Sequence, residues 1–264
     1  MFFRKKKAEE DPQDLIARKE YKKAISMLRD RLKKDPEDLT LRLNLCETLL
    51  LDKQPDQAFN EYRKLASDYT DQGFLVKAVA IYKKMLKLRP EDKKIEVLLS
   101  NLSDRRDMEA VAESESPPGG HLEIETRLFK GLAPVEFRQI IGKLTLRHLD
   151  EDTIVVREGD PGDSLFIIVR GEVRVITRDS RQREVTLASL GEGEFFGEVA
   201  LLTGKPRTAT IITNTGSELL ELTRKDFEGI VARHPNVKKV MQDFHLQRAY
   251  KTVEAMVQSF REKG

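Results

Sequence analysis

The spacing of apolar residues changes once along the chain, and this change separates a helical part from a strand-forming part. From Asp14 to about Leu102, apolar residues recur every three or four positions between lysines and glutamates, which is typical of amphipathic helices. From Ile154 onward they alternate in short runs, such as Glu184–Ala188, with glycine-bearing turns between the runs. Because 264 residues are enough for two small cores, the sequence predicts an all-α unit followed by a β unit.

Composition sets the boundaries that we expect between these units. Residues 1–13 form a basic tail, residues 14–103 form helical repeats, and residues 104–120 combine charge, serine, proline and glycine with little to bury, which predicts a flexible linker. A β domain follows at residues 121–235. An amphipathic helix at residues 236–264 ends the chain. The expected fold class is therefore α+β with several domains.

The helical part contains an internal repeat. Ala24, Ala58 and Ala78 each begin a version of one short segment, and the first two of these alanines are 34 residues apart. Prolines stand twelve residues after Ala24 and after Ala78, at Pro36 and Pro90. This spacing resembles the tetratricopeptide repeat. The last copy matches the signature of that family at Tyr62, Leu65, Ala66, Tyr69, Gly73, Ala78, Tyr82 and Pro90.

The resemblance implies stacked helices with a concave surface that binds a protein partner. Two to three repeats can equally form a dimerisation unit or a spacer, and the sequence leaves open whether the chain forms a homodimer. We favour partner binding, although no residue in the repeats identifies the partner.

The β part contains the most informative segment, Phe195–Thr210, which resembles the phosphate-binding cassette of cyclic-nucleotide-binding domains. Upstream, Arg157–Ile168 and Gly171–Val173 match the glycine-bearing strand turns of that family, and Leu128–Leu132 matches its helical lead-in. The resemblance covers about 115 residues, 121–235. It implies a β-roll of jelly-roll type, also called a double-stranded β-helix, with flanking helices.

A cyclic phosphodiester carries one negative charge, so its burial requires a fixed cation and backbone donors. Arg207 is the expected cation, and a short helix beginning at Gly197 would direct unpaired N–H groups at the same phosphate. The resemblance implies that Glu198 accepts a hydrogen bond from the ribose 2′-hydroxyl. The predicted ligand-binding set is Phe196, Gly197, Glu198, Val199, Ala200, Arg207, Thr208, Ala209 and Arg248.

The identity of the base stays open between cyclic AMP and cyclic GMP. Thr208 follows the arginine, as in cyclic-GMP-dependent kinases and cyclic-nucleotide-gated channels, whereas alanine is usual in cyclic-AMP-dependent kinases. We lean to cyclic AMP on generality alone. The last helix is expected to cover the pocket, with Arg248 either contacting the base or standing exposed on the helix. Phe244, Leu246 and Tyr250 are alternative caps.

Two other interpretations of the β domain remain. Glu198 and Arg207 could form a structural ion pair in a scaffold whose nucleotide domain is vestigial, or the domain could read another ligand such as a cyclic dinucleotide. Desolvation of an arginine is costly when no anion pairs with it, which favours the cyclic mononucleotide. The expected function is a sensor and adaptor in which the ligand moves the C-terminal helix and modulates protein binding by the repeats.

Composition argues against several other functions. Lysine and arginine total 47 against 45 acidic residues, and no helix-turn-helix module follows the last helix, so we expect no DNA binding. The single Cys46 and four scattered histidines form no metal or catalytic site, so we expect neither an enzyme nor a cofactor. No apolar run approaches the roughly 18 residues of a membrane span, and no secretory signal is present. A cytoplasmic, bacterial signalling protein fits these features best.

Overall fold

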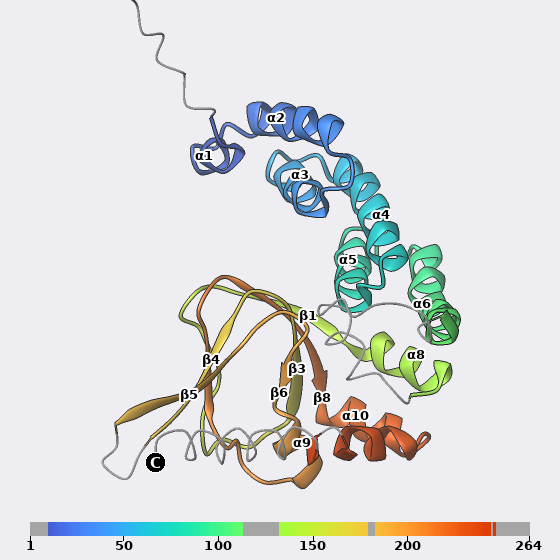
Figure 1. Ribbon diagram of the computed structural model, residues 1–264, viewed down its shortest axis with the longest axis vertical. Helices are drawn as coiled ribbons and strands as arrows, with labels where there is room; N and C mark the ends of the chain where they lie inside the picture. The colour runs from blue at the N-terminus through green and yellow to red at the C-terminus, as the bar shows by residue number, and fades with distance from the viewer. Residues whose placement is uncertain (1–9, 113–131, 179–182, 244, 247–264) are drawn as a thin grey trace, which may run out of the picture.

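The computed structural model describes residues 10–112, 132–178, 183–243 and 245–246 (Figure 1). Its first part is a stack of antiparallel helices in which each helix packs against the next. Figure 1 shows these helices following a curved path along one end of the β domain. The helices are α1 (Pro12–Ala17), α2 (Tyr21–Lys34), α3 (Leu39–Leu51), α4 (Pro55–Asp71), α5 (Leu75–Leu88) and α6 (Lys93–Ala112).

The repeated alanines lie buried in the core of the helical repeats. Ala58 and Ala78 are completely buried, and Tyr62 is 1% exposed between the helices. A residue without a long side chain allows two helix axes to approach, and the neighbouring tyrosine fills the remaining space. The predicted helical repeat is confirmed. Helix α6 continues to Ala112, into the segment expected as a linker, because arginine, methionine, glutamate and alanine at residues 105–112 favour the helix.

The second part is a β-roll of two antiparallel sheets with helices attached. One sheet has the strand order β1-β8-β3-β6 and the other β2-β7-β4-β5. The strands are β1 (Thr145–Leu149), β2 (Ile154–Val156), β3 (Ser164–Arg170), β4 (Val173–Arg178), β5 (Glu184–Leu190), β6 (Phe195–Phe196), β7 (Thr210–Thr213) and β8 (Ser217–Thr223). The helices are α8 (Pro134–Lys143), α9 (Glu198–Thr203) and α10 (Arg224–Val231), and residues 236–243 are also helical.

Alternation along β8 divides the apolar residues between two cores. Leu219 belongs to the smaller core, between the two sheets, together with Phe166 and Ile168. Leu220 and Leu222 point the opposite way, into a larger core that continues through α8 and α10 and into the helical repeats. The predicted β-roll with flanking helices is confirmed. The larger core joins it to the repeats.

Three of the expected segments fall wholly or largely on residues that the structure does not describe. These are most of the basic tail, the rest of the expected linker with the helical lead-in that follows it, and the end of the C-terminal helix. Among the described residues, no helix is both long enough and apolar enough to cross a membrane.

Candidate functional site

A partly open cavity of about 140 Å³ lies in the β-roll beside α9. The lining residues are Val156, Val175, Leu190, Phe196, Gly197, Glu198, Val199, Ala200, Arg207, Thr208, Ala209 and Ile211. The structure therefore brings together eight of the nine residues that we predicted to bind a ligand. Their contact with that ligand stays a prediction.

The site begins at Gly197, the residue between the end of β6 and the start of α9. This residue has φ of +88°, a conformation that side chains other than glycine rarely adopt. A Cβ atom here would lie 2.6 Å from Arg207 Nη1 and 2.7 Å from the carbonyl oxygen of Ser164. Glycine is thus required twice, once to turn the chain from β6 into α9 and once to admit the guanidinium group.

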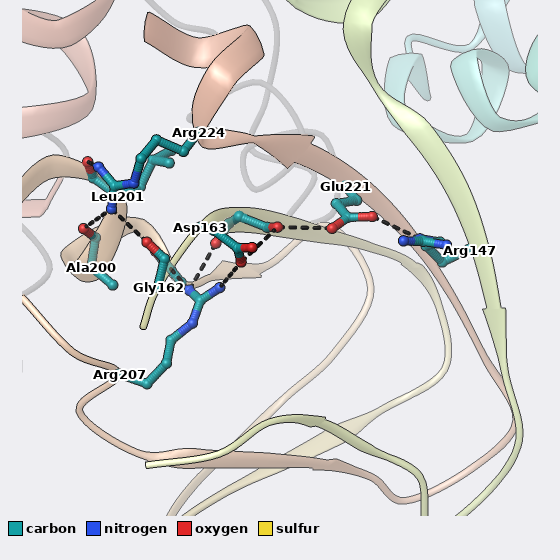
Figure 2. Close-up of polar contacts among 10 residues, drawn as sticks. Arg147, Gly162, Asp163, Ala200, Leu201, Arg207, Glu221 and Arg224 are labelled. Atoms are coloured by element: carbon teal, nitrogen blue, oxygen red, sulfur yellow. Dashed lines mark hydrogen bonds and ion pairs between the residues drawn. The ribbon is translucent and has the colours of Figure 1, made fainter. Parts of the chain in front are cut away.

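Arg207 is fixed through both its backbone and its side chain. Its backbone N–H donates to the carbonyl of Asp160 at 2.8 Å, and its own carbonyl accepts from Gly159 at 2.9 Å. Its Nη1 donates to the carbonyls of Ser164 at 2.7 Å and Gly197 at 3.2 Å (Figure 2). The guanidinium group is therefore held in one position before any ligand arrives.

The charge of Arg207 is poorly compensated. Its side chain is 4% exposed, and the carboxylate of Asp163, in a side chain that is itself 83% exposed, is 3.8 Å away. Burial lowers the pKa of the Arg207 guanidinium, and the charge of Asp163 opposes this shift only in part. A buried cation of this kind favours an anion that enters the cavity.

Glu198, the first residue of α9, contacts His245, which the sequence did not suggest. Its carboxylate lies 3.4 Å from Nδ1 of His245, and its side chain is 9% exposed. Among the described residues, Glu198 and Arg207 therefore do not form the direct ion pair considered as an alternative. Glu198 contacts His245, whereas Arg207 contacts Asp163 and two backbone carbonyls. In the sequence, His245 is one of four scattered histidines, because its separation of 47 positions from Glu198 carries no spacing signal.

Arg224 is the second residue that sequence reasoning missed. It is the first residue of α10, and its guanidinium group donates to the carbonyls of Ala200 at 2.7 Å, Leu201 at 3.1 Å and Gly162 (Figure 2). It therefore joins the carboxyl end of α9 to the loop before β3. An arginine at the start of a polar helix looks like a solvated residue in the sequence, so no signal could have identified it.

The remaining walls of the cavity are apolar. Val156, Val175, Leu190 and Ile211 come from the four strands β2, β4, β5 and β7. Polar groups thus gather on the side of α9 and Arg207, and apolar side chains on the other. An amphipathic ligand with an anionic end and a flat apolar end suits this distribution.

The expected caps of the pocket are only partly described. Arg248, Phe244 and Tyr250 lie outside the described residues. Leu246 is 53% exposed and is not among the residues that line the cavity. In the part of the chain that the structure describes, no group of three histidine, cysteine or acidic side chains is placed to hold a metal ion.

Comparisons with known proteins match two separate parts of the chain. Residues 146–234 match the family model of the cyclic nucleotide-binding domain, and residues 15–73 match that of the tetratricopeptide repeat. A cyclic nucleotide-gated potassium channel of Mesorhizobium japonicum is 34% identical over 121 residues, which are 46% of this chain and 32% of the channel. The cyclic AMP receptor protein of Thermus thermophilus is 36% identical over 110 residues, 42% of this chain and 51% of that protein.

Among solved structures, the catabolite activator protein of Thermus thermophilus aligns with a TM-score of 0.46 at 32% identity, covering 52% of this chain and 64% of its own. The chain spans about a third of the length of the first of these curated relatives and about half of the length of the second. In chain order, the chain contains tetratricopeptide repeats, at residues 15–73, and a cyclic nucleotide-binding domain, at residues 146–234.

Proposed function

We propose that the protein is a sensor of a cyclic mononucleotide, and not an enzyme. The observation that carries this proposal is Arg207, a buried cation whose closest carboxylate is 3.8 Å away and which lines a cavity with apolar walls. A cyclic phosphodiester supplies the missing negative charge. Its base would lie against the apolar strands opposite.

Recognition of the sugar falls to Glu198. Its carboxylate lines the cavity and accepts hydrogen bonds only, so it suits the 2′-hydroxyl of a ribose. Because His245 is 3.4 Å from the same carboxylate, the ribose and the C-terminal segment would compete for Glu198 or share it. Binding would then change how this segment sits on the β-roll. That change would in turn alter what the repeats or the segment bind.

The test is a calorimetric titration of the protein with a panel of nucleotides. Cyclic AMP and cyclic GMP differ in the base, 2′-deoxy cyclic AMP lacks the 2′-hydroxyl, and 5′-AMP lacks the cyclic phosphodiester. Cyclic di-GMP represents the dinucleotides. We expect binding of cyclic AMP or cyclic GMP, with affinity reduced about tenfold or more for the 2′-deoxy compound, which lacks the hydrogen-bond donor for Glu198. Binding of cyclic di-GMP alone, or of none of the panel, would contradict the proposal.

A further inference from the structure

Helix α5 of the repeats is seated on the β domain by four lysine side chains. Its apolar residues are buried around most of its circumference, because it packs against α4 and α6 on one side and against β1 and β3 on the other. The polar contacts join Lys77 to Glu192 at 2.8 Å, Lys83 to the carbonyl of Gly142 at 3.1 Å, Lys84 to Glu218 at 2.8 Å and Lys87 to the carbonyl of Leu146 at 3.4 Å.

Lys84 and Glu218 form the centre of this interface. Their side chains are 8% and 7% exposed, so the pair is withdrawn from water. Lys84 also contacts Glu47 of α3 at 3.0 Å, and Arg170 contacts both glutamates at 3.4 Å. Burial alone would raise the pKa of Glu218, but the charges of Lys84 and Arg170 bring it below its ordinary value. Loss of one partner from a buried group of this kind is costly, so the pair fixes where α5 sits.

The strands that carry this interface also reach the nucleotide site. Arg170 at the end of β3 is paired in register with Glu218 at the start of β8. At the other end of the same strand pair, the carbonyl of Ser164 accepts from Nη1 of Arg207 at 2.7 Å, and the hydroxyl of Ser164 donates to Glu221 at 2.8 Å. Glu221 in turn accepts a hydrogen bond from Nε of Arg147 at 2.7 Å, and Figure 2 shows Arg207, Glu221 and Arg147 together.

A phosphate in the cavity would compete with the carbonyl of Ser164 for the guanidinium group of Arg207. We propose that this exchange shifts the β3–β8 strand pair and, through the positioning pair Glu218 and Lys84, the repeat helix α5. The inference rests on the proposed function and deepens it. Nucleotide binding would then act on the repeats through the strands of the β-roll, independently of the C-terminal segment.

Coupling between two sites is reciprocal, so a change at the interface must alter nucleotide affinity. We expect Lys84→Met, which keeps the aliphatic stem and removes the charge, to change the Kd for cyclic AMP or cyclic GMP by about fivefold or more. Lys84→Arg should restore most of the original affinity. The matched control is Lys94→Met on α6, an exposed lysine. If Lys84→Met does not fold, Glu218→Gln tests the same contact from the other side.

Hydrogen exchange of α5 separates coupling from mere stabilisation. In the unmodified protein, nucleotide binding should change amide exchange in residues 75–88, and in Lys84→Met the change should be confined to the β domain. A purely structural role would raise exchange equally with and without nucleotide. The inference is overturned if the protein binds nucleotide with no change in α5 and Lys84→Met keeps the original Kd. If the protein binds no cyclic nucleotide, the proposed function fails, and this inference fails with it.

Discussion

Two glycines with positive φ bound α9, and they differ in what surrounds them. Gly197 precedes the helix with φ of +88°, and Gly204 follows it with φ of +71°. A Cβ at Gly197 would collide with Arg207 and Ser164, whereas no heavy atom lies within 4 Å of a Cβ at Gly204. Only the first glycine is therefore tied to the site.

Alanine at each position separates backbone strain from steric exclusion. Both variants force alanine into a left-handed conformation, at a cost of about 1–2 kcal/mol each. Gly197→Ala should in addition displace the guanidinium group and weaken cyclic nucleotide binding by about tenfold or more beyond the effect of Gly204→Ala. Calorimetry on both variants checks this. Equal affinities in the two variants would mean that Gly197 has no role beyond the turn.

Lys83 gives the stability of the protein a pH dependence of its own. Burial, followed by the charge of Lys143, lowers the pKa of Lys83 to about 8, whereas lysine in an unfolded chain titrates near about 10.4. Between these values the unfolded state binds more protons than the folded state, so this group makes the free energy of unfolding rise with pH. Urea denaturation at several pH values between 7 and 10 should show this rise reduced in Lys83→Met and retained in Lys94→Met. An unchanged rise in Lys83→Met would contradict the assignment.

At the scale of elements, the position of α9 depends on a side chain outside the cavity. Arg224 donates to the carbonyls of Ala200 and Leu201 at the end of that helix, yet it does not line the cavity. Arg224→Met should therefore lower cyclic nucleotide affinity by about tenfold, because α9 loses its anchor while all ligand contacts remain. Arg233→Met, an exposed arginine after α10, is the control. Calorimetric titration of both variants measures the two affinities. Equal affinities would show that Arg224 does not contribute to nucleotide binding.

The elements themselves were largely predictable, because their signals are local. The continuous apolar run Leu165–Val169 became β3, and the Gly197–Thr203 stretch became the turn and α9. Contacts between distant residues were not predictable in this way. The pairing of Lys84 with Glu218 joins residues 134 positions apart, and the sequence shows them only as charged residues in two separate units. The seat of α5 on the β-roll was missed for that reason, as were His245 and Arg224.

At the scale of the whole molecule, a continuous apolar core joins the repeats to the β-roll. It runs from the repeats through Leu146 and Ile167 to Phe227 and Met241. Units that share a core are expected to unfold together. Cys46 can report the unfolding of the repeats. It is fully buried, and burial raises the pKa of its thiol, so the thiol is unreactive in the folded state.

Unfolding in urea should therefore show one transition. The reaction of Cys46 with a thiol reagent and the loss of far-ultraviolet circular dichroism should have the same midpoint, and cyclic nucleotide should shift both midpoints upward together. Exposure of Cys46 at a lower urea concentration, unaffected by nucleotide, would show that the repeats unfold independently of the β-roll.

Arg207 is a buried cation that lines the cavity, and we propose that it binds a cyclic phosphodiester there. The most direct measurement is the Kd of the preferred cyclic nucleotide for the unmodified protein, for Arg207→Ala and for the control Arg233→Ala. We predict that Arg207→Ala weakens binding by about 100-fold or more, which corresponds to about 2.8 kcal/mol, with no change in the control. Affinity in Arg207→Ala within about threefold of the unmodified protein would contradict the claim.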